Sequence, residues 1–314
     1  MGKIPVGRTI GQSYEFSFQK YGVILGIIWL PTLLLFALGY FLFWPVFLQI
    51  AGSLPAAIQN PADSSMPLLI GTIFGRIFLF DILVLSVFVM FKVGITKEIL
   101  GLRKGPRYFY LPTGADELRV IVSYIILFAI VYAVLLAVAL AIALIAVIGS
   151  VIFAGAAQNF DLKTISAPLH VALFLLDAGL EFFWMYVAMR LSYLLVPATV
   201  AEKRIVVTRS WELTKGNFWR IILISIVMWV PLVLLESVFF AFAAEPIFFD
   251  IVTAAHSGRA AVAAEIGKLL KNYIYYMPYI WGVGLLISPI YYGLTSAAPA
   301  FSYRALLPAP AAAE

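Results

Sequence analysis

The sequence predicts an all-α, polytopic integral membrane protein, and its composition and apolar pattern carry that prediction. Of the 314 residues, 63% are hydrophobic and only 12% are charged, whereas soluble domains are about half apolar and a quarter charged. Apolar runs of about 20 residues, long enough to cross a hydrocarbon layer, recur along the chain. No cysteine is present, so neither disulfides nor thiolate metal sites are available. We therefore expect a single membrane domain over residues 1–314.

Six transmembrane helices are predicted, each bounded by prolines, charged residues or polar turns. Pro67 and Pro168 suit the first turn of a helix, where the missing N–H is not needed. The third span is the longest and, at about 1.5 Å per residue, exceeds a hydrocarbon layer of about 30 Å, so it should tilt or project beyond the layer. The predicted spans cover about residues 22–44, 67–91, 118–153, 168–197, 218–244 and 276–295.

Interfacial amphipathic helices are predicted before the first and fifth spans. Residues 1–21 form the first of them, with one side made of Ile10, Tyr14, Phe18 and Tyr21. Residues 202–216 form the second, in which Gly216 suits the helix end and Asn217 suits the cap of the next helix. The stretch RYFYLPTGADELR before span three is a candidate third copy. Three units of one interfacial helix and two spans would then make up the chain.

The distribution of basic residues predicts that both termini are cytoplasmic. With an inside amino terminus, 16 of the 21 Lys and Arg residues fall on the cytoplasmic side, as the positive-inside rule requires. Lys163, Arg259, Lys268 and Lys271 fall outside, and Arg76 falls within a span. The first span has no small-residue cleavage site after it, so we interpret it as a retained span and not as a signal peptide.

The most polar and most patterned stretch is RSWELTKGNFWR, which the predicted topology places in the cytoplasmic connection between spans four and five. Tryptophans at the membrane interface and basic side chains that reach phosphates are typical of a helix lying in the headgroup layer. A plain interfacial anchor with no partner of its own is the simpler interpretation. The predicted headgroup contacts are Arg209, Trp211, Lys215, Trp219 and Arg220.

The run RLSYLLVPATVAEKRIVVTRSWELTKGNFWR resembles the membrane domain of bacterial glycerophosphodiester phosphodiesterases and the related YciC-like six-span membrane proteins. The resemblance implies a six-span fold and a bacterial inner-membrane location. It carries no catalytic residue across, because the soluble metal-binding phosphodiesterase domain of that family is not expected here. The only histidines, His170 and His256, are far apart in the sequence.

Charged residues inside the predicted spans are the candidate site for ions or solutes. A charge in hydrocarbon costs at least about 2.5 to 3.5 kcal/mol, so these side chains should face inward and find partners. Four carboxylates cannot all be neutralised by one arginine, which leaves protonation, hydration or a bound cation for the others. The simpler alternative is a structural ion-pair network that fixes helix packing. The predicted cluster comprises Arg76, Asp81, Asp177, Glu181 and Glu236.

These features predict a non-enzymatic inner-membrane protein of lipid or envelope homeostasis that acts by binding lipid or a partner, as a scaffold or accessory subunit. The alternative is a transporter or channel-like protein that moves a cation, proton, lipid or small polar solute through an outward-facing acidic cavity. No catalytic set, metal site or cofactor is expected. The expected partners are membrane lipids and a membrane-protein partner or a second copy of the chain, with no nucleic acid.

Overall fold

The computed structural model describes residues 2–59, 65–103, 114–156, 162–256 and 258–307, and every regular element in these ranges is an α-helix. Three helices are short: α1 (Val6–Gln19), α6 (Leu195–Glu202) and α7 (Val207–Leu213). The long helices are α2 (Tyr21–Gln59), α3 (Ser65–Ile99), α4 (Ala115–Ala156), α5 (Leu162–Ser192), α8 (Phe218–His256) and α9 (Arg259–Leu306).

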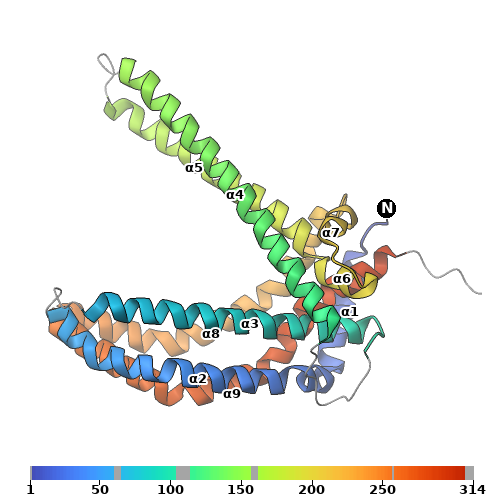
Figure 1. Cartoon of the computed structure of the whole chain (residues 1–314), viewed down its shortest axis with the longest axis horizontal. Coiled ribbons are helices and arrows are strands. Elements are labelled where there is room, and N and C mark those ends of the chain that lie inside the picture. The colour runs from blue at the N-terminus through green and yellow to red at the C-terminus, as the bar shows by residue number, and fades with distance from the viewer. Residues whose placement is uncertain (1, 60–64, 104–113, 157–161, 257, 308–314) are drawn as a thin grey trace, which may run out of the picture.

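The long helices form two arms that diverge from a common base (Figure 1). Helices α4 and α5 make the hairpin arm, and α2, α3, α8 and α9 make the four-helix arm, in which α9 packs against the other three. The three short helices gather where the arms meet, and we call them, with the adjoining ends of the long helices, the hub. The chain therefore has the shape of a fork whose base is the hub.

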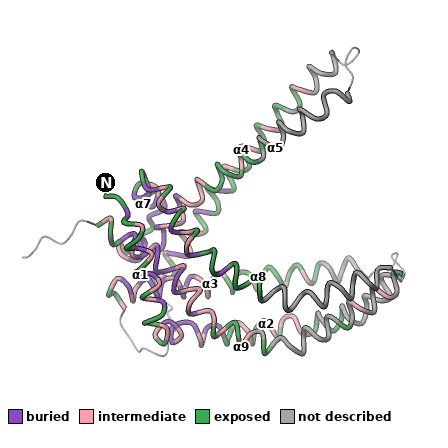
Figure 2. The backbone as a smooth tube through the Cα atoms, turned by 180° about the vertical axis from the view of Figure 1, so that it is seen from behind, coloured by how far each residue is buried: buried purple, intermediate pink, exposed green. Residues whose placement is uncertain are grey.

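Buried residues concentrate in the hub, while the described parts of the arms are largely intermediate or exposed (Figure 2). One cluster joins the amino-terminal Ile4 to Ile221, Ile224 and Met228 of α8 and to Leu294 of α9. Removal of such side chains from water contributes about 25 cal/mol per Å² of apolar area, a gain that does not apply where the alternative surroundings are lipid. The helices are consequently held together at one end, and the apolar surface of the arms is left for lipid.

The multi-pass character of the chain is confirmed, whereas the number of spans is confirmed only in part. Within the described residues, five helical segments are long and apolar enough to cross a membrane. They are Tyr21–Val46, Gly71–Ile99, Ala115–Gly149, Ala178–Glu202 and Phe218–Val238. The predicted sixth span, residues 276–295, lies within α9 but is not among the five. Its tyrosines, prolines and glycines make it the least apolar of the predicted spans.

Two predicted boundaries need correction at the carboxyl-terminal end of span four. The helix expected to end at Pro197 ends as α5 at Ser192, and α6 restarts at Leu195 with Pro197 in its first turn. The single interfacial helix expected over residues 202–216 is instead the end of α6 and the seven-residue α7. A left-handed Lys203, with φ 52°, separates the two, and helical periodicity alone does not reveal such a reversal. The candidate third interfacial helix falls mostly on residues 104–113, outside the described residues.

Ile10 and Tyr14 of the predicted apolar side pack against the core of α8 and α9, but a neighbouring side of α1 is buried more deeply. Its buried residues are Thr9, Ser13 and Ser17, whereas Phe18 remains 59% exposed. A methyl group added at Gly293 of α9 would lie only 2.7 Å from the Ser17 hydroxyl oxygen. Small side chains on both helices therefore allow the close approach, as they do between transmembrane helices generally.

Side-chain hydroxyls from the start of the chain bond to carbonyls near prolines in the long helices. Pro231 has no N–H to donate to the carbonyl of Val227, and the Tyr14 hydroxyl donates to that oxygen at 3.0 Å. The Tyr21 hydroxyl donates to the Leu286 carbonyl at 2.7 Å, one residue after the Leu285 carbonyl that Pro289 leaves without an N–H donor. Such partners are needed in a membrane, where water cannot reach a freed backbone group.

Candidate functional site

The polar and aromatic residues of α7 surround one buried cation, Arg190 at the end of α5. Arg190 is 6% exposed, and its guanidinium lies 3.8 Å from the centroid of the Trp211 ring. Its Nη2 donates to the Trp211 carbonyl at 2.6 Å, its Nη1 to the Tyr186 hydroxyl at 2.8 Å, and its Nε to the Thr214 hydroxyl at 3.3 Å. A buried charge is tolerated when neutral dipoles and an aromatic face solvate it in this way.

The backbone of Arg190 is held by the same helix. Ser210 and Thr214 each donate a hydroxyl to the Arg190 carbonyl, at 3.1 and 3.2 Å. This carbonyl lies next to the break between α5 and α6, where regular helical partners run out. Ser210, Trp211 and Thr214 of the SWELT stretch thus hold both the side chain and the backbone of Arg190, beside the break between α5 and α6.

The side chain of Asn217, predicted to cap α8, instead holds the amino-terminal segment. Its Oδ1 accepts from the Ile4 N–H at 3.0 Å, and its Nδ2 donates to the Gly2 carbonyl at 3.1 Å. Arg220 Nη1 donates to the Ile4 carbonyl at 2.8 Å. The amide thereby acts as a backbone mimic for an extended segment that has no strand beside it. The cap function falls to the Asn217 carbonyl, which accepts from Ile221 N–H at 2.9 Å.

The predicted headgroup contacts divide between surface and interior. Trp219 is 68% exposed, and Lys215 is exposed. Arg209 pairs with Glu212 at 3.1 Å and with Glu202 at 3.4 Å. The Trp211 ring and one nitrogen of Arg220 already have partners within the protein, as described above. Contact of these residues with lipid headgroups stays a prediction.

Glu202 at the end of α6 links the hub to the carboxyl-terminal end of α9. Besides Arg209, it pairs with Arg204 at 2.6 Å, and its Oε1 lies 3.5 Å from the Tyr303 hydroxyl. Burial, and then the Glu202 carboxylate, raise the pKa of the Tyr303 hydroxyl. Tyr303 therefore remains protonated and able to donate well above neutral pH.

The charged residues predicted to share one mid-membrane cluster lie on different arms. Arg76 and Asp81 belong to α3 and Glu236 to α8, whereas Asp177 and Glu181 belong to α5 of the hairpin arm (Figure 1). Helical rise predicts the depth of a residue but not the direction in which its helix leaves the hub, which is why equal depth did not mean proximity.

Arg76 has a backbone acceptor. Its Nη1 donates to the Leu42 carbonyl of α2 at 2.6 Å, one turn before Pro45, where the helical hydrogen-bond ladder is weakened. Among the described residues, Asp81, Glu181 and Glu236 are exposed and form neither ion pairs nor hydrogen bonds. The side chain of Asp177 lies outside the described residues. Arg76 thus supports the structural interpretation, while the acids remain without a protein counterion in that part of the chain.

A cavity of about 300 Å³ lies at the base of the fork, and we call it the fork cavity. Both arms line it, through α3, α8 and α9 on one side and α4 and α5 on the other. The polar side chains in its lining include Lys92, Tyr124, Ser192 and Ser225, and the described residues that line it include no Asp or Glu. Sequence reasoning missed this cavity, although Lys92 within an apolar run was an available signal.

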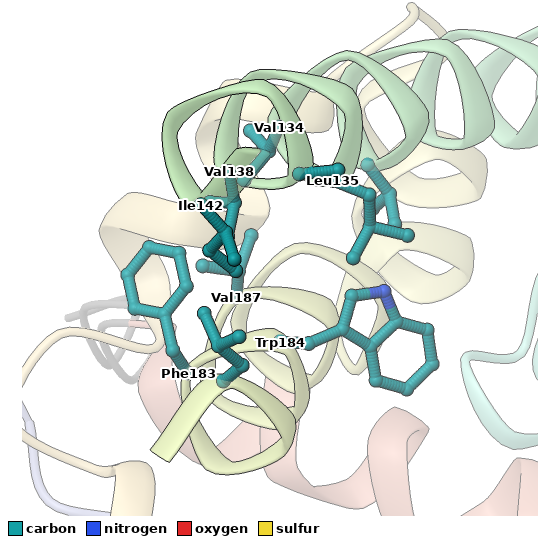
Figure 3. A pocket seen from close by; sticks show the side chains of 10 residues that line it. Val134, Leu135, Val138, Ile142, Phe183, Trp184 and Val187 are labelled. Atoms are coloured by element: carbon teal, nitrogen blue, oxygen red, sulfur yellow. The ribbon is translucent and has the colours of Figure 1, made fainter. Parts of the chain in front are cut away.

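A second, wholly apolar groove of about 170 Å³ runs between α4 and α5 (Figure 3). Figure 3 shows Val134, Val138 and Ile142 of α4 lying opposite Phe183 and Val187 of α5. No charged side chain lines the groove. Its chemistry suits a hydrocarbon chain, which needs dispersion contacts and no hydrogen bonds.

Comparison of the chain with protein-family models, curated proteins and solved structures finds no match. The resemblance to the phosphodiesterase membrane domain and the YciC-like proteins therefore stays a prediction. Among the described residues, no three His, Asp or Glu side chains are grouped so that they could hold a metal ion.

Proposed function

We propose that this chain is a six-span protein of the bacterial cytoplasmic membrane that works in lipid or envelope homeostasis by binding lipid or a protein partner, without catalysis of its own. The fork cavity is the observation that carries the proposal. It joins a cation, several hydroxyls and apolar walls at the place where two arms separate. Small-molecule sites combine apolar walls with a few polar groups in the same way.

The apolar groove on the hairpin arm supports binding of a lipid in particular. An amphipathic ligand needs a polar site near the membrane surface and an apolar surface deeper in the bilayer. Tyr124 of the fork cavity and Val131 of the groove lie on one side of α4, separated along it by about 10 Å of helical rise. The hairpin arm therefore offers both kinds of surface.

The proposed orientation places the hub and both termini in the cytoplasm, because the basic residues gather at the hub end. A reporter enzyme fused after Glu314 tests it. Alkaline phosphatase should be inactive there, since it folds only in the periplasm, and a cytoplasmic reporter should be active. The opposite result would reverse the topology and place the fork cavity in the outer leaflet.

Copurification tests the binding function. The full chain, extracted from its native membrane into a mild detergent, should retain lipid or a protein partner in a fixed ratio through two chromatographic steps. Mass spectrometry of the intact complex identifies what is retained. Release of all lipid and protein at the rate seen for an unrelated multi-pass protein would contradict the proposal.

Transport is the second candidate, favoured by the unpaired carboxylates Asp81, Glu181 and Glu236 at membrane depth. A charge exposed to hydrocarbon is unfavourable, and an aqueous pathway or a transported cation would relieve that cost. Proteoliposomes containing the chain should then pass protons or cations, and Glu236→Gln should reduce the flux without unfolding the protein. Unchanged permeability relative to empty liposomes would exclude this candidate for the ions tested.

A further inference from the structure

We infer that the fork cavity binds the headgroup of an anionic glycerophospholipid, and that phosphatidylglycerol is the class it fits best. The inference rests on the proposed lipid-binding function and adds the site, the ligand class and the residue that recognises it. Four observations support it: an unpaired cation, unpaired hydroxyls, the lack of acidic lining residues, and the depth of the cavity.

Lys92 is the cation that would bind the phosphate. Its only described interaction is with an aromatic ring, because its Nζ lies 4.5 Å from the centroid of Phe88. By contrast, Lys97 in the next turn lies 3.0 Å from both Asp116 and Glu117. Lys97 is thus neutralised by two carboxylates of the protein, whereas Lys92, on the same helix, is left for an external anion.

The depth of Lys92 matches the phosphate layer and the ester region below it. The residue lies about 10 Å along α3 from the helix end at Ile99, and Ser225 lies about 10 Å from the start of α8. Both helix ends belong to the hub, so the two side chains meet the cavity at a common level. A lipid phosphate can reach this level from the bilayer, and basic pockets between helices on the cytoplasmic side are known to bind anionic headgroups.

The hydroxyls and the missing acids distinguish between headgroups. Tyr124, Ser192 and Ser225 have hydroxyls that form no hydrogen bond within the described residues. They can exchange hydrogen bonds with the glycerol hydroxyls of phosphatidylglycerol. The ammonium of phosphatidylethanolamine would need a carboxylate, and none lines the cavity. Burying the ethanolamine ammonium without a carboxylate partner is unfavourable. The site therefore favours phosphatidylglycerol by leaving the ammonium of phosphatidylethanolamine unpaired.

The apolar part of the lining fits the rest of the lipid. Met189, Met228 and Trp229 form walls of the cavity, and methionine adapts its shape to a flexible ligand. A volume of about 300 Å³ holds a headgroup and not a whole lipid. The acyl chains must therefore continue outside the cavity, between the diverging arms and into the bilayer.

Native mass spectrometry of the full chain in detergent, titrated separately with phosphatidylglycerol and phosphatidylethanolamine, tests the inference. The wild-type protein should retain phosphatidylglycerol more strongly. Lys92→Gln should weaken phosphatidylglycerol binding about tenfold, because a charge-assisted hydrogen bond is lost, and should leave phosphatidylethanolamine binding nearly unchanged. Lys92→Arg should keep the preference, and Ser225→Leu, which fills the cavity, should lower phosphatidylglycerol retention towards that of phosphatidylethanolamine.

Lys20→Gln is the matched control, since Lys20 is an exposed lysine at the hub, between α1 and α2, and lies outside the cavity lining. Equal lipid retention by Lys92→Gln and Lys20→Gln would overturn the site and leave lipid binding itself intact. An equal affinity of the wild-type protein for the two lipids would overturn the headgroup class. Retention of neither lipid by the wild-type protein would instead contradict the proposed function.

Discussion

The hub and the hairpin arm both contain stretches of sequence that are apolar enough to cross a membrane, yet the side chains of these stretches have different surroundings. Over its most apolar window, the candidate span Ala178–Glu202, which ends in the hub, is 56% buried within the protein, whereas Ala115–Gly149 of the hairpin arm is 11% buried. In the hub, polar residues decide which helices meet. In the arm, apolar residues face lipid and specify no neighbour. Substitutions in the hub should therefore be costly and those in the arm nearly neutral.

Arg190→Ala should give the largest effect, a loss of about 3 to 5 kcal/mol in the free energy of unfolding. The substitution removes the cation and leaves the Trp211 carbonyl and two hydroxyls without their partner. Thermal unfolding in one detergent measures it, with Leu140→Ala on α4 as the arm control, where a 62% exposed side chain should cost below about 0.5 kcal/mol. Equal shifts in unfolding temperature for the two variants would contradict the proposed difference between the hub and the arm.

Gly293→Ala should cost about 1 to 3 kcal/mol, because the new methyl group would crowd Ser17 and the Ile24 side chain, which lies 3.0 Å away. Gly284→Ala in the same helix meets nothing within 4 Å and should be neutral or stabilising. The second substitution Ser17→Gly should recover most of the loss in the Gly293→Ala background. Failure of that rescue would show that crowding against α1 is not the cause.

Asn217→Ala should cost about 1 to 2 kcal/mol and release the amino-terminal segment. The Ile4 N–H and the Gly2 carbonyl both lose their partner, and each lost hydrogen bond costs about 1 kcal/mol. Limited proteolysis should then cleave within the first residues of the variant sooner than in the wild type. Asn217→Asp keeps the acceptor for Ile4 and should show an intermediate rate, and equal rates for all three proteins would contradict the tether.

Tyr14→Phe should have the smallest effect, a loss of about 1 kcal/mol, since the Val227 carbonyl beside Pro231 loses its hydroxyl donor. Pro231→Ala restores a backbone N–H for that carbonyl. In a double-mutant cycle, Tyr14→Phe should therefore cost less in the Pro231→Ala background than in the wild type. Identical costs in both backgrounds would show that the Tyr14 hydroxyl does not compensate for the N–H that Pro231 lacks.

Composition and apolar runs were sufficient to predict the helical, multi-pass character of the chain and the positions of its long helices. They could not predict how the helices diverge, because an apolar side chain that faces lipid looks the same in sequence as one that faces a neighbour. The break between α5 and α6 was missed because it depends on the partners of Arg190, and the reversal between α6 and α7 was missed because it depends on the left-handed Lys203; no local propensity encodes either.

The candidate site was predictable only where a residue broke the pattern around it. The SWELT stretch was recognised as unusual, but its role required knowing that Arg190 lies beneath Trp211. The mid-span charges were expected at a common depth, yet a position along a helix does not specify the arm to which that helix belongs. The fork cavity draws its lining from five helices that are distant in sequence, and such a set becomes visible only after folding.

The tether between Ile4 and Asn217 joins two residues that lie 213 positions apart in the chain. Ile4 is synthesised before four long helices, so its docking site exists only once those helices have been made and the start of α8 has followed. Until then the Ile4 N–H and the Gly2 carbonyl have no Asn217 side chain to bond, and a chain truncated before Asn217 keeps this segment undocked.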